Sequence, residues 1–469
     1  MTTIQQPLLM VDTGLEPGPL TLHSTTGLIG GVASCHASAS NNVSGADIFI
    51  THPYIAGRVF NASRNGHMIG NNTVGNPGTN PDPKWTCMAG SNDGGVTWSQ
   101  TITTALNDYD NDGFNTGENG PAGHAMYHVT HNDDSSSPRW WMSAGWWPHH
   151  DTDPTGSDSH PYLATSTDLL NWSRVKVDRH FQSSVNSSGW INQMVVAEYG
   201  NGRLIAHNRT TGSVNISTND GSSWGGWTHT DYPLQFIGAA DMRYTHIKHQ
   251  GGTSNNWIMV NKHGAIAWST NNGTSWSTTG SYPNYSKYYP RLGNSTYQNE
   301  RCAFIQYFPD LYGGCWVWLG AKFTGNYNST VNPMIMYSTN MSSWTTLLNS
   351  TNGSSIGLPS DLGTYGLGTA TAGDQLIEID GTYYLWLRRD NSVVSNSKPS
   401  PYELWRSKGD LESWEKLYDS PFHDGSGTLY NFSKPTMSYS PIDKRLHIGV
   451  DQDGDPTDGC GRVAYIDFQ

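Results

Sequence analysis

The sequence is poor in charged residues and in cysteine, and both shortages exclude classes of protein. Charged residues make up 14 % of the 469 residues, with 26 Lys and Arg against 39 Asp and Glu and a net charge of −13. No basic cluster occurs, so we expect no nucleic-acid partner, because nucleic acid is bound through local positive charge. The five cysteines form no CxxC pair, which argues against a zinc or thioredoxin-type site, and their odd number favours free buried thiols over disulfides.

Long apolar runs are also missing. No run approaches the roughly 18 residues of a membrane span, so we expect no membrane insertion. The N-terminal stretch "MTTIQQPLLMVDTG" lacks the charged start and the continuous apolar core of a secretory signal. The rest of the chain is rich in Asn, Ser, Thr and Trp and poor in Lys, which is typical of extracellular proteins. An extracellular or virion location reconciles these observations; a secreted protein whose signal had been removed is the alternative.

What the sequence does contain is a repeated polar stretch that ends in tryptophan. Successive tryptophans of these stretches are 52 to 74 residues apart, a spacing that indicates a propeller or a solenoid. The six copies are "SNDGGVTW" ending at Trp98, "STDLLNW" at Trp172, "STNDGSSW" at Trp224, "STNNGTSW" at Trp276, "STNMSSW" at Trp344 and "SKGDLESW" at Trp414.

Each copy has the chemistry of a hairpin turn. A strand-like alternation precedes it and another follows, so the copy is the connection between two strands. Its Asn or Asp accepts hydrogen bonds from turn amides, its Gly supplies a positive φ, and its Trp buries a ring between neighbouring sheets. A catalytic site requires one copy, whereas a repeated fold requires many. The six stretches therefore predict architecture.

The third repeat shows the complete unit. Strands at 193–200 and 202–209 are joined by Asn201-Gly202, a strong two-residue hairpin signal, and "GSVNIS" precedes the repeat. After the last repeat, "KPTMSYS", "KRLHIGVD" and "GRVAYIDF" predict three more strands, and the N-terminal "PLLMVD" is the expected fourth.

The predicted fold is all-β, a single β-propeller domain over residues 1–469. It has seven four-stranded blades closed by N-terminal and C-terminal strands, with residues 1–20 as an arm that completes the last blade. Six blades are the alternative, in which the tail only packs against the ring.

The pattern SxDxGxTW resembles the Asp-box, or BNR repeat, of sialidases and related propellers, and the resemblance extends over nearly the whole chain. The segment "QMVVAEYGNGRLIAHNR" is similar to the sialidase segment in which a glutamate precedes one strand and an arginine closes the next. The resemblance implies that Arg209 grips a substrate carboxylate and that Gln193 stands where the family has its glutamate.

The glutamine changes what the resemblance implies about activity. In sialidases the glutamate takes the proton of a nucleophilic tyrosine, whose ordinary pKa near ~10 makes it a poor nucleophile without a base. An amide offers no such proton affinity. The family's N-terminal motif with another carboxylate-binding arginine is also missing, since Arg58 lacks that context. The resemblance therefore implies the fold without sialidase activity.

A Trp-rich stretch, "RWWMSAGWWPHHDTDPTGSDSH" at 139–160, lies between the first two repeats. Aromatic rings of this kind stack on the flat CH faces of sugars, which makes the stretch a candidate glycan-contact site. Its first part also alternates like a buried strand, so a core role is the alternative. The candidate residues are Trp140, Trp141, Trp146 and Trp147.

Two acidic turns are candidate calcium sites. "DYDNDGFNTGEN" opens like a calcium loop, with acids at alternate positions before a glycine, and "DQDGDPTDG" is a second acidic turn. We expect any bound Ca²⁺ to tie down loops, and a solvated acidic turn is the alternative. The candidate ligands are Asp108, Asp110 and Asp112 in the first turn and Asp451, Asp453 and Asp455 in the second.

Two functions follow from these patterns. The first is a non-catalytic sialidase-fold propeller, a phage virion or tail-associated protein whose partners are host-surface glycans or other virion proteins. The second is a secreted glycoside hydrolase or polysaccharide lyase. Binding of glycans without turnover would distinguish the first from the second.

Overall fold

The computed structural model describes residues 15–22, 48–63, 87–97, 128–144, 162–174, 195–208, 214–225, 246–260, 266–278, 300–323, 331–350, 352–360, 362, 375–388, 402–419, 432–452 and 462–469. These ranges contain β-strands, two short 3-10 turns and no α-helix. The two turns are η5 (Leu311–Gly313) and η6 (Ser354–Ile356). Within these ranges, no helix has the length and apolar character to cross a bilayer.

The strands of the described residues form seven antiparallel sheets, five with four strands and two with three. Strands within a sheet follow chain order, except in the last sheet, which also takes a strand from the N-terminus. The sheets are β2 (Ile48–Thr51), β3 (Val59–Ser63), β4 (Cys87–Ser91); β5 (His128–His131), β6 (Trp140–Ala144), β7 (Tyr162–Ser166), β8 (Trp172–Arg174); β9 (Val195–Gly200), β10 (Arg203–Asn208), β11 (Val214–Ser217); β12 (His246–His249), β13 (Trp257–Val260), β14 (Ile266–Ser269), β15 (Ser277–Thr278); β16 (Glu300–Phe308), β17 (Cys315–Phe323), β18 (Val331–Ser338), β19 (Thr345–Asn349); β20 (Leu376–Ile379), β21 (Thr382–Arg388), β22 (Tyr402–Lys408), β23 (Trp414–Asp419); and β24 (Phe432–Ser440), β25 (Arg445–Gln452), β26 (Arg462–Asp467), β1 (Thr21–Leu22).

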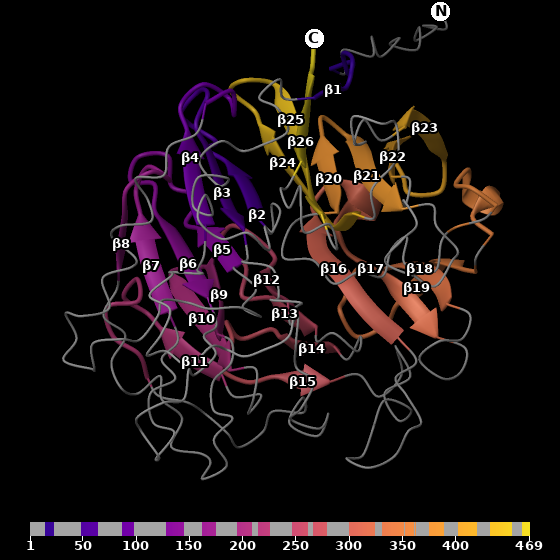
Figure 1. Cartoon of the computed structure of the whole chain (residues 1–469). Coiled ribbons are helices and arrows are strands. Elements are labelled where there is room, and N and C mark those ends of the chain that lie inside the picture. Colours follow the sequence, from indigo (N-terminus) through magenta and orange to yellow (C-terminus); the bar gives the residue numbers. More distant parts are fainter. Residues whose placement is uncertain are drawn as a thin grey trace, which may run out of the picture.

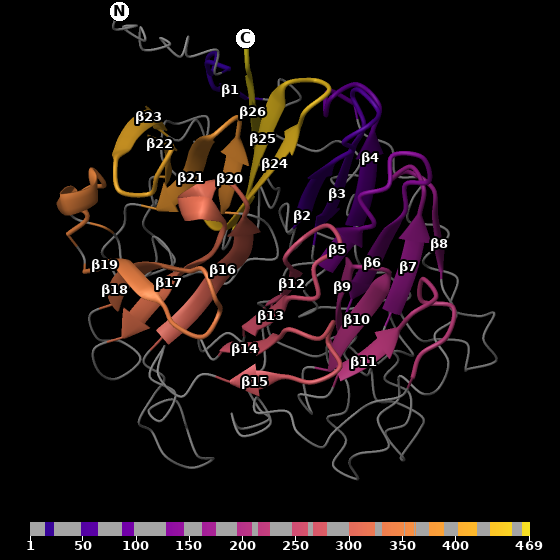
Figure 2. The ribbon, with the colours of Figure 1, turned by 180° about the vertical axis from the view of Figure 1, so that it is seen from behind.

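The sheets succeed one another around a common centre (Figure 1). The first strand of each sheet lies nearest that centre and the last strand lies at the rim, and the view from behind shows the same order (Figure 2). Inner strands of successive sheets contact one another, as β5 does with β9, β9 with β12 and β12 with β16. The contact of β2 with β24 joins the first sheet to the last. The chain is therefore an all-β propeller.

The last sheet is closed by a strand from the N-terminus, as predicted, but that strand lies later in the sequence than expected. β1 pairs with β26 through Thr21 opposite Tyr465, and the expected strand at 7–12 lies outside the described residues. The Gly18 N–H donates to the Asp467 carbonyl at 2.7 Å. A Cβ at Gly18 would stand 2.8 Å from that oxygen, so the glycine permits the close approach that sets the pairing.

The hydrophobic core lies between neighbouring sheets. One cluster joins strands β16 to β19 with strands β20 to β23, and Trp316 and Trp318 belong to the next cluster, between β13–β14 and β16–β18. Both tryptophans are at most 1 % exposed. Cys315 is a free, buried thiol whose burial raises its pKa to about 12, which agrees with the prediction of free cysteines for this residue.

We call the repeated stretches boxes. Four of them are the turns between the third and fourth strands of a sheet, as predicted, and the boxes that end at Trp98 and Trp224 follow the third strands β4 and β11, the last that the structure describes in their sheets. The indole of each box tryptophan that the structure describes donates to the carbonyl of the residue three positions earlier. These bonds join Trp172 to Leu169 at 3.1 Å, Trp224 to Gly221 at 3.1 Å, Trp276 to Gly273 at 3.0 Å, Trp344 to Met341 at 3.1 Å and Trp414 to Leu411 at 2.8 Å. The tryptophan thus closes its own turn as well as packing.

Positive φ in the boxes is not confined to glycine. Gly221 and Gly273 have φ of 80° and 77°, as the sequence predicts, but Leu169 and Met341 take the same place with φ of 63° and 61°. Their side chains are 0 % and 3 % exposed. Burial of an apolar side chain therefore offsets the backbone strain where glycine is absent.

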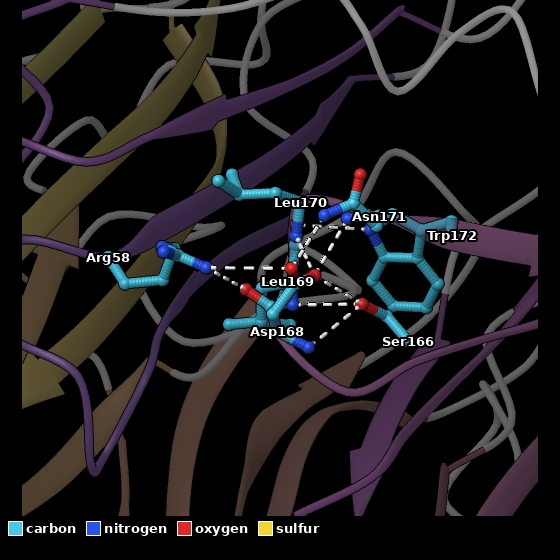
Figure 3. A network of polar contacts seen from close by, with 7 residues as sticks. All are labelled: Arg58, Ser166, Asp168, Leu169, Leu170, Asn171 and Trp172. Carbon is cyan, nitrogen blue, oxygen red and sulfur yellow. Dashed lines mark hydrogen bonds and ion pairs between the residues drawn. The ribbon is translucent and has the colours of Figure 1, made fainter.

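The second box is held by a carboxylate (Figure 3). Asp168 Oδ1 accepts from the backbone N–H groups of Leu170 at 2.9 Å and Asn171 at 2.7 Å, and Asp168 Oδ2 accepts from Asn171 Nδ2 at 2.6 Å. Arg58 Nη1, from the neighbouring first sheet, donates to the Asp168 carbonyl at 2.8 Å and lies 3.9 Å from its carboxylate. Burial raises the pKa of Asp168, but the hydrogen bonds from Asn171 and Leu170 outweigh it and lower the pKa below its ordinary value. The box joins two sheets as well as two strands.

Replacing Asp168 by alanine is expected to lower the free energy of unfolding by about 2 to 3 kcal/mol, because several turn amides lose their acceptor. Asp168→Asn is the matched control and should cost less than about 1 kcal/mol. Asparagine accepts the same backbone bonds at the equivalent position of three other boxes, at Asn219, Asn271 and Asn340. Urea unfolding of both variants measures the difference. Equal losses would mean that the charge, and not the turn geometry, stabilises the box.

Candidate functional site

The two ends of the propeller carry different connections. The turn between first and second strands lies beside the box of the same sheet: Gly94 N–H donates to the Gly57 carbonyl at 2.8 Å, and Gly409 N–H donates to the Gly381 carbonyl at 3.0 Å. We call the end that holds these turns the box side. Because neighbouring strands of an antiparallel sheet alternate in direction, the second strand of each sheet ends on the opposite side.

The hairpin that carries the resemblance to the sialidase segment is present. Asn201 and Gly202 form its turn with φ of 47° and 73°, and β9 and β10 pair from Gly200 opposite Arg203 to Val195 opposite Asn208. Gln193 and Arg209 lie outside the described residues, two positions before β9 and one position after β10. The described pairing of β9 with β10 therefore ends within two residues of both candidate ligand-binding positions.

Trp140 and Trp141 are core residues, each 1 % exposed. The Trp141 ring stacks on Tyr199 of the next sheet, with centroids 4.8 Å apart and planes 6° apart, and its indole donates to the Asp220 carbonyl at 3.3 Å. The Trp140 ring lies 4.4 Å from the His52 ring. Packing between sheets thus occupies both rings, which corrects the expectation that they contact a glycan. Trp146 and Trp147 lie outside the described residues, just beyond the end of β6.

The predicted calcium ligands are almost all beyond the described residues. Asp451 alone belongs to a described strand, β25, where it pairs with Ser433. The others are Asp108, Asp110, Asp112, Asp453 and Asp455. The described part of the chain holds no cluster of three His, Cys, Asp or Glu side chains suited to a metal ion. Calcium in the two acidic turns stays a prediction.

Sequence reasoning missed a recurrent histidine on the box side. His52, His131 and His249 each end the first strand of a sheet or follow it directly. In each, Nδ1 faces the backbone N–H two residues later. The distances are 3.0 Å from His52 to Tyr54, 3.3 Å from His131 to Asp133 and 3.1 Å from His249 to Gly251. The signal in the sequence is the repeated Thr-His before a turn, at 51–52 and 130–131.

These imidazoles support turns. His52 is fully buried, and burial, with the Arg58 charge, lowers its pKa to about 4, so the ring is neutral near pH 7. His249 Nε2 lies 2.7 Å from the Ser254 carbonyl, which identifies Nε2 as the protonated nitrogen and leaves Nδ1 as the acceptor. Burial lowers the pKa of His249 too. The imidazoles on the box side therefore support turns, whereas Trp146, Trp147 and Arg209 follow second strands, which end on the other side.

Comparison with family models and with curated proteins gives no match. Solved structures with similar folds include the sialidase of Trypanosoma rangeli bound to the inhibitor DANA, at 11 % identity and a TM-score of 0.40, over 91 % of this chain and 55 % of the sialidase. A GH74 xyloglucanase of Xanthomonas campestris matches at 10 % identity and a TM-score of 0.44, over 89 % and 53 %. YCF48 bound to D1 peptide matches at 13 % identity and a TM-score of 0.43, over 92 % and 95 %.

This chain thus spans about half the length of the two enzymes and nearly all of YCF48. Its assignment as a propeller rests on its own sheets and boxes.

Proposed function

We propose that this chain is a glycan-recognition propeller that binds acidic glycans without hydrolysing them, as a surface or tail-associated protein of a phage particle. The binding site would lie on the side opposite the boxes, at the junction of the second and third sheets. Its ligand-binding residues would be Gln193, Arg209, Trp146 and Trp147.

The observation that carries this proposal is the direction of two neighbouring second strands. β6 and β10 belong to adjacent sheets, which contact each other through β5, β6 and β9. Both strands run away from the box side. Trp146 and Trp147 follow the end of β6, and Arg209 follows the end of β10. Chain direction therefore favours a site in which Trp146, Trp147 and Arg209 lie on the same side of the ring.

The side-chain chemistry supports binding in preference to turnover. A guanidinium pairs with a carboxylate through two parallel hydrogen bonds, and indole rings stack on the CH faces of sugars. The amide of Gln193 orients a ligand through hydrogen bonds but accepts no proton at neutral pH. The Asn, Ser and Thr richness of the chain fits an exposed particle component.

A glycan array with parallel fluorogenic glycoside assays tests the proposal. We expect binding of carboxylate-bearing glycans, no turnover, and at least a tenfold loss of affinity in Arg209→Ala and in Trp146→Ala with Trp147→Ala. The matched control is Arg203→Ala, which removes an arginine from the other end of the same strand and should leave affinity unchanged. Turnover by the natural sequence would favour the glycoside hydrolase instead. Equal effects of the two arginine variants would place the site elsewhere.

A further inference from the structure

The large apolar side chains that the described residues expose gather at one place. They lie in three turns on the box side: the turn between β2 and β3, the first box, and the turn between β24 and β25. Exposed aliphatic side chains scattered singly are ordinary, but a contiguous group marks an interaction surface. We call the group the closure patch; its members are Tyr54, 36 % exposed, Ile55, 37 %, Val96, 45 %, and Ile442, 47 %.

Hydrogen bonds draw the three turns together. The Gly57 N–H donates to the Asp443 carboxylate at 2.8 Å, and the Gly94 N–H donates to the Gly57 carbonyl at 2.8 Å. Each patch residue of the three turns lies within three positions of one of these bonded residues, and consecutive Cα atoms are about 3.8 Å apart. Residues almost 390 positions apart in the sequence therefore form one surface where the first sheet meets the last.

Two glycines hold this surface in a fixed shape. Gly57 has φ of 68°, and a Cβ there would stand 2.6 Å from the Asn92 carbonyl oxygen. Gly94 has φ of 71°, and its Cβ would stand 2.9 Å from Arg445 Nη1. Neither position accepts a side chain without displacement of its neighbour. Because the backbone is fixed, these turns need little ordering when a partner binds.

One edge of the closure patch is acidic. The Tyr54 hydroxyl donates to the Asp133 carbonyl at 3.1 Å, which brings the patch beside the Asp133 carboxylate, 75 % exposed. Asp134 follows it. The pKa of Asp133 is lowered, chiefly by His131, and that of Asp134 is lowered by its bonds to Ser136, so both carboxylates are charged at neutral pH. The net charge of −13 adds to this attraction for a basic partner and opposes association between copies of the chain.

We propose that the closure patch is the docking surface for a basic, aliphatic segment of a partner protein. Aliphatic side chains of the segment would cover Ile55, Val96 and Ile442, and its Lys or Arg side chains would face Asp133 and Asp134. The surface lies on the side opposite the proposed glycan site, so a carrier and a glycan can be bound at once. The proposal does not depend on the glycan function.

Selection from a displayed library of random twelve-residue peptides on the whole chain tests this inference. We expect enriched peptides to combine Leu, Ile, Val or Phe with Lys or Arg. A synthetic peptide of the enriched sequence should bind at least tenfold more weakly to the Val96→Asp, Ile442→Asp double variant. It should bind three- to tenfold more weakly to Asp133→Asn with Asp134→Asn, and the difference should shrink at high salt.

The matched control is Thr270→Asp with Thr339→Asp, which adds the same two charges at exposed positions in boxes of other sheets. This control should bind the peptide as the natural chain does. Failure to enrich any peptide, enrichment of acidic peptides, or unchanged binding by the patch variant would overturn the proposal. So would a concentration-dependent dimer that Val96→Asp with Ile442→Asp abolishes, because a second copy would then occupy the patch.

Discussion

A chain that begins at residue 23 is expected to lose about 4 kcal/mol of unfolding free energy relative to the full chain, or to fail to fold. Such a chain lacks the strand that completes the last sheet. The loss corresponds to about 1 kcal/mol net for each hydrogen bond that is broken. Four of these bonds are Glu16 N–H to Gln469 O at 3.3 Å, Gln469 N–H to Glu16 O at 3.1 Å, Gly18 N–H to Asp467 O at 2.7 Å and Tyr418 OH to Gly18 O at 2.6 Å.

A chain that begins at residue 15 is the control for this truncation. It keeps β1 and the ion pairs of Glu16 with Arg406 at 2.9 Å and Lys408 at 3.2 Å, so its stability should stay within about 1 kcal/mol of the full chain. Chemical unfolding measures both losses, and light scattering should show that only the shorter chain aggregates, since its β26 edge is exposed. Equal stability of the two truncated chains would show that the ring closes without β1.

Trp141→Ala is expected to lower the free energy of unfolding by about 4 kcal/mol, within the range for removal of a buried aromatic side chain. The ring contacts Leu163 and Leu204 and stacks on Tyr199, so its removal leaves a cavity between the second and third sheets. The variant also leaves the Asp220 carbonyl without its indole donor. Denaturant unfolding monitored by circular dichroism gives the loss.

Trp141→Phe separates packing from hydrogen bonding. It keeps most of the buried ring and loses the indole N–H, so we expect a cost of about 1 kcal/mol. Its affinity for any glycan that the chain binds should equal that of the natural sequence, because the native ring is 1 % exposed. A change in glycan affinity without a change in stability would show that Trp141 contacts the sugar. A loss below about 1 kcal/mol in the alanine variant would contradict its core role.

The two proposed surfaces divide the propeller by strand direction. Loops that follow second strands would bind glycans, and turns that join first to second strands would dock a carrier protein at the junction of the first and last sheets. Of the boxes, only the first takes a direct part, through Val96 of the closure patch. Polar groups of the boxes, such as those of Asp93 and Asn271, form hydrogen bonds within their own turns. The boxes therefore support the structure of the ring.

The sequence by itself determined the features that depend on local hydrogen bonds. Each box closes within eight residues, so its turn follows from its own side chains wherever it stands in the ring. The Asn201-Gly202 hairpin and the three strands after the last box follow for the same reason, since turn chemistry and alternation act over a few residues.

Only the tertiary structure decided the features that depend on contacts between sheets. Strand alternation predicts that one of two adjacent tryptophans is buried, but both Trp140 and Trp141 are, because a propeller blade is covered on both faces. The choice of Thr21–Leu22 to close the last sheet depends on Gly18 approaching Asp467, and the closure patch depends on Gly57 meeting Asp443. Contacts across hundreds of residues leave no local pattern, because their energy depends on how the whole ring closes.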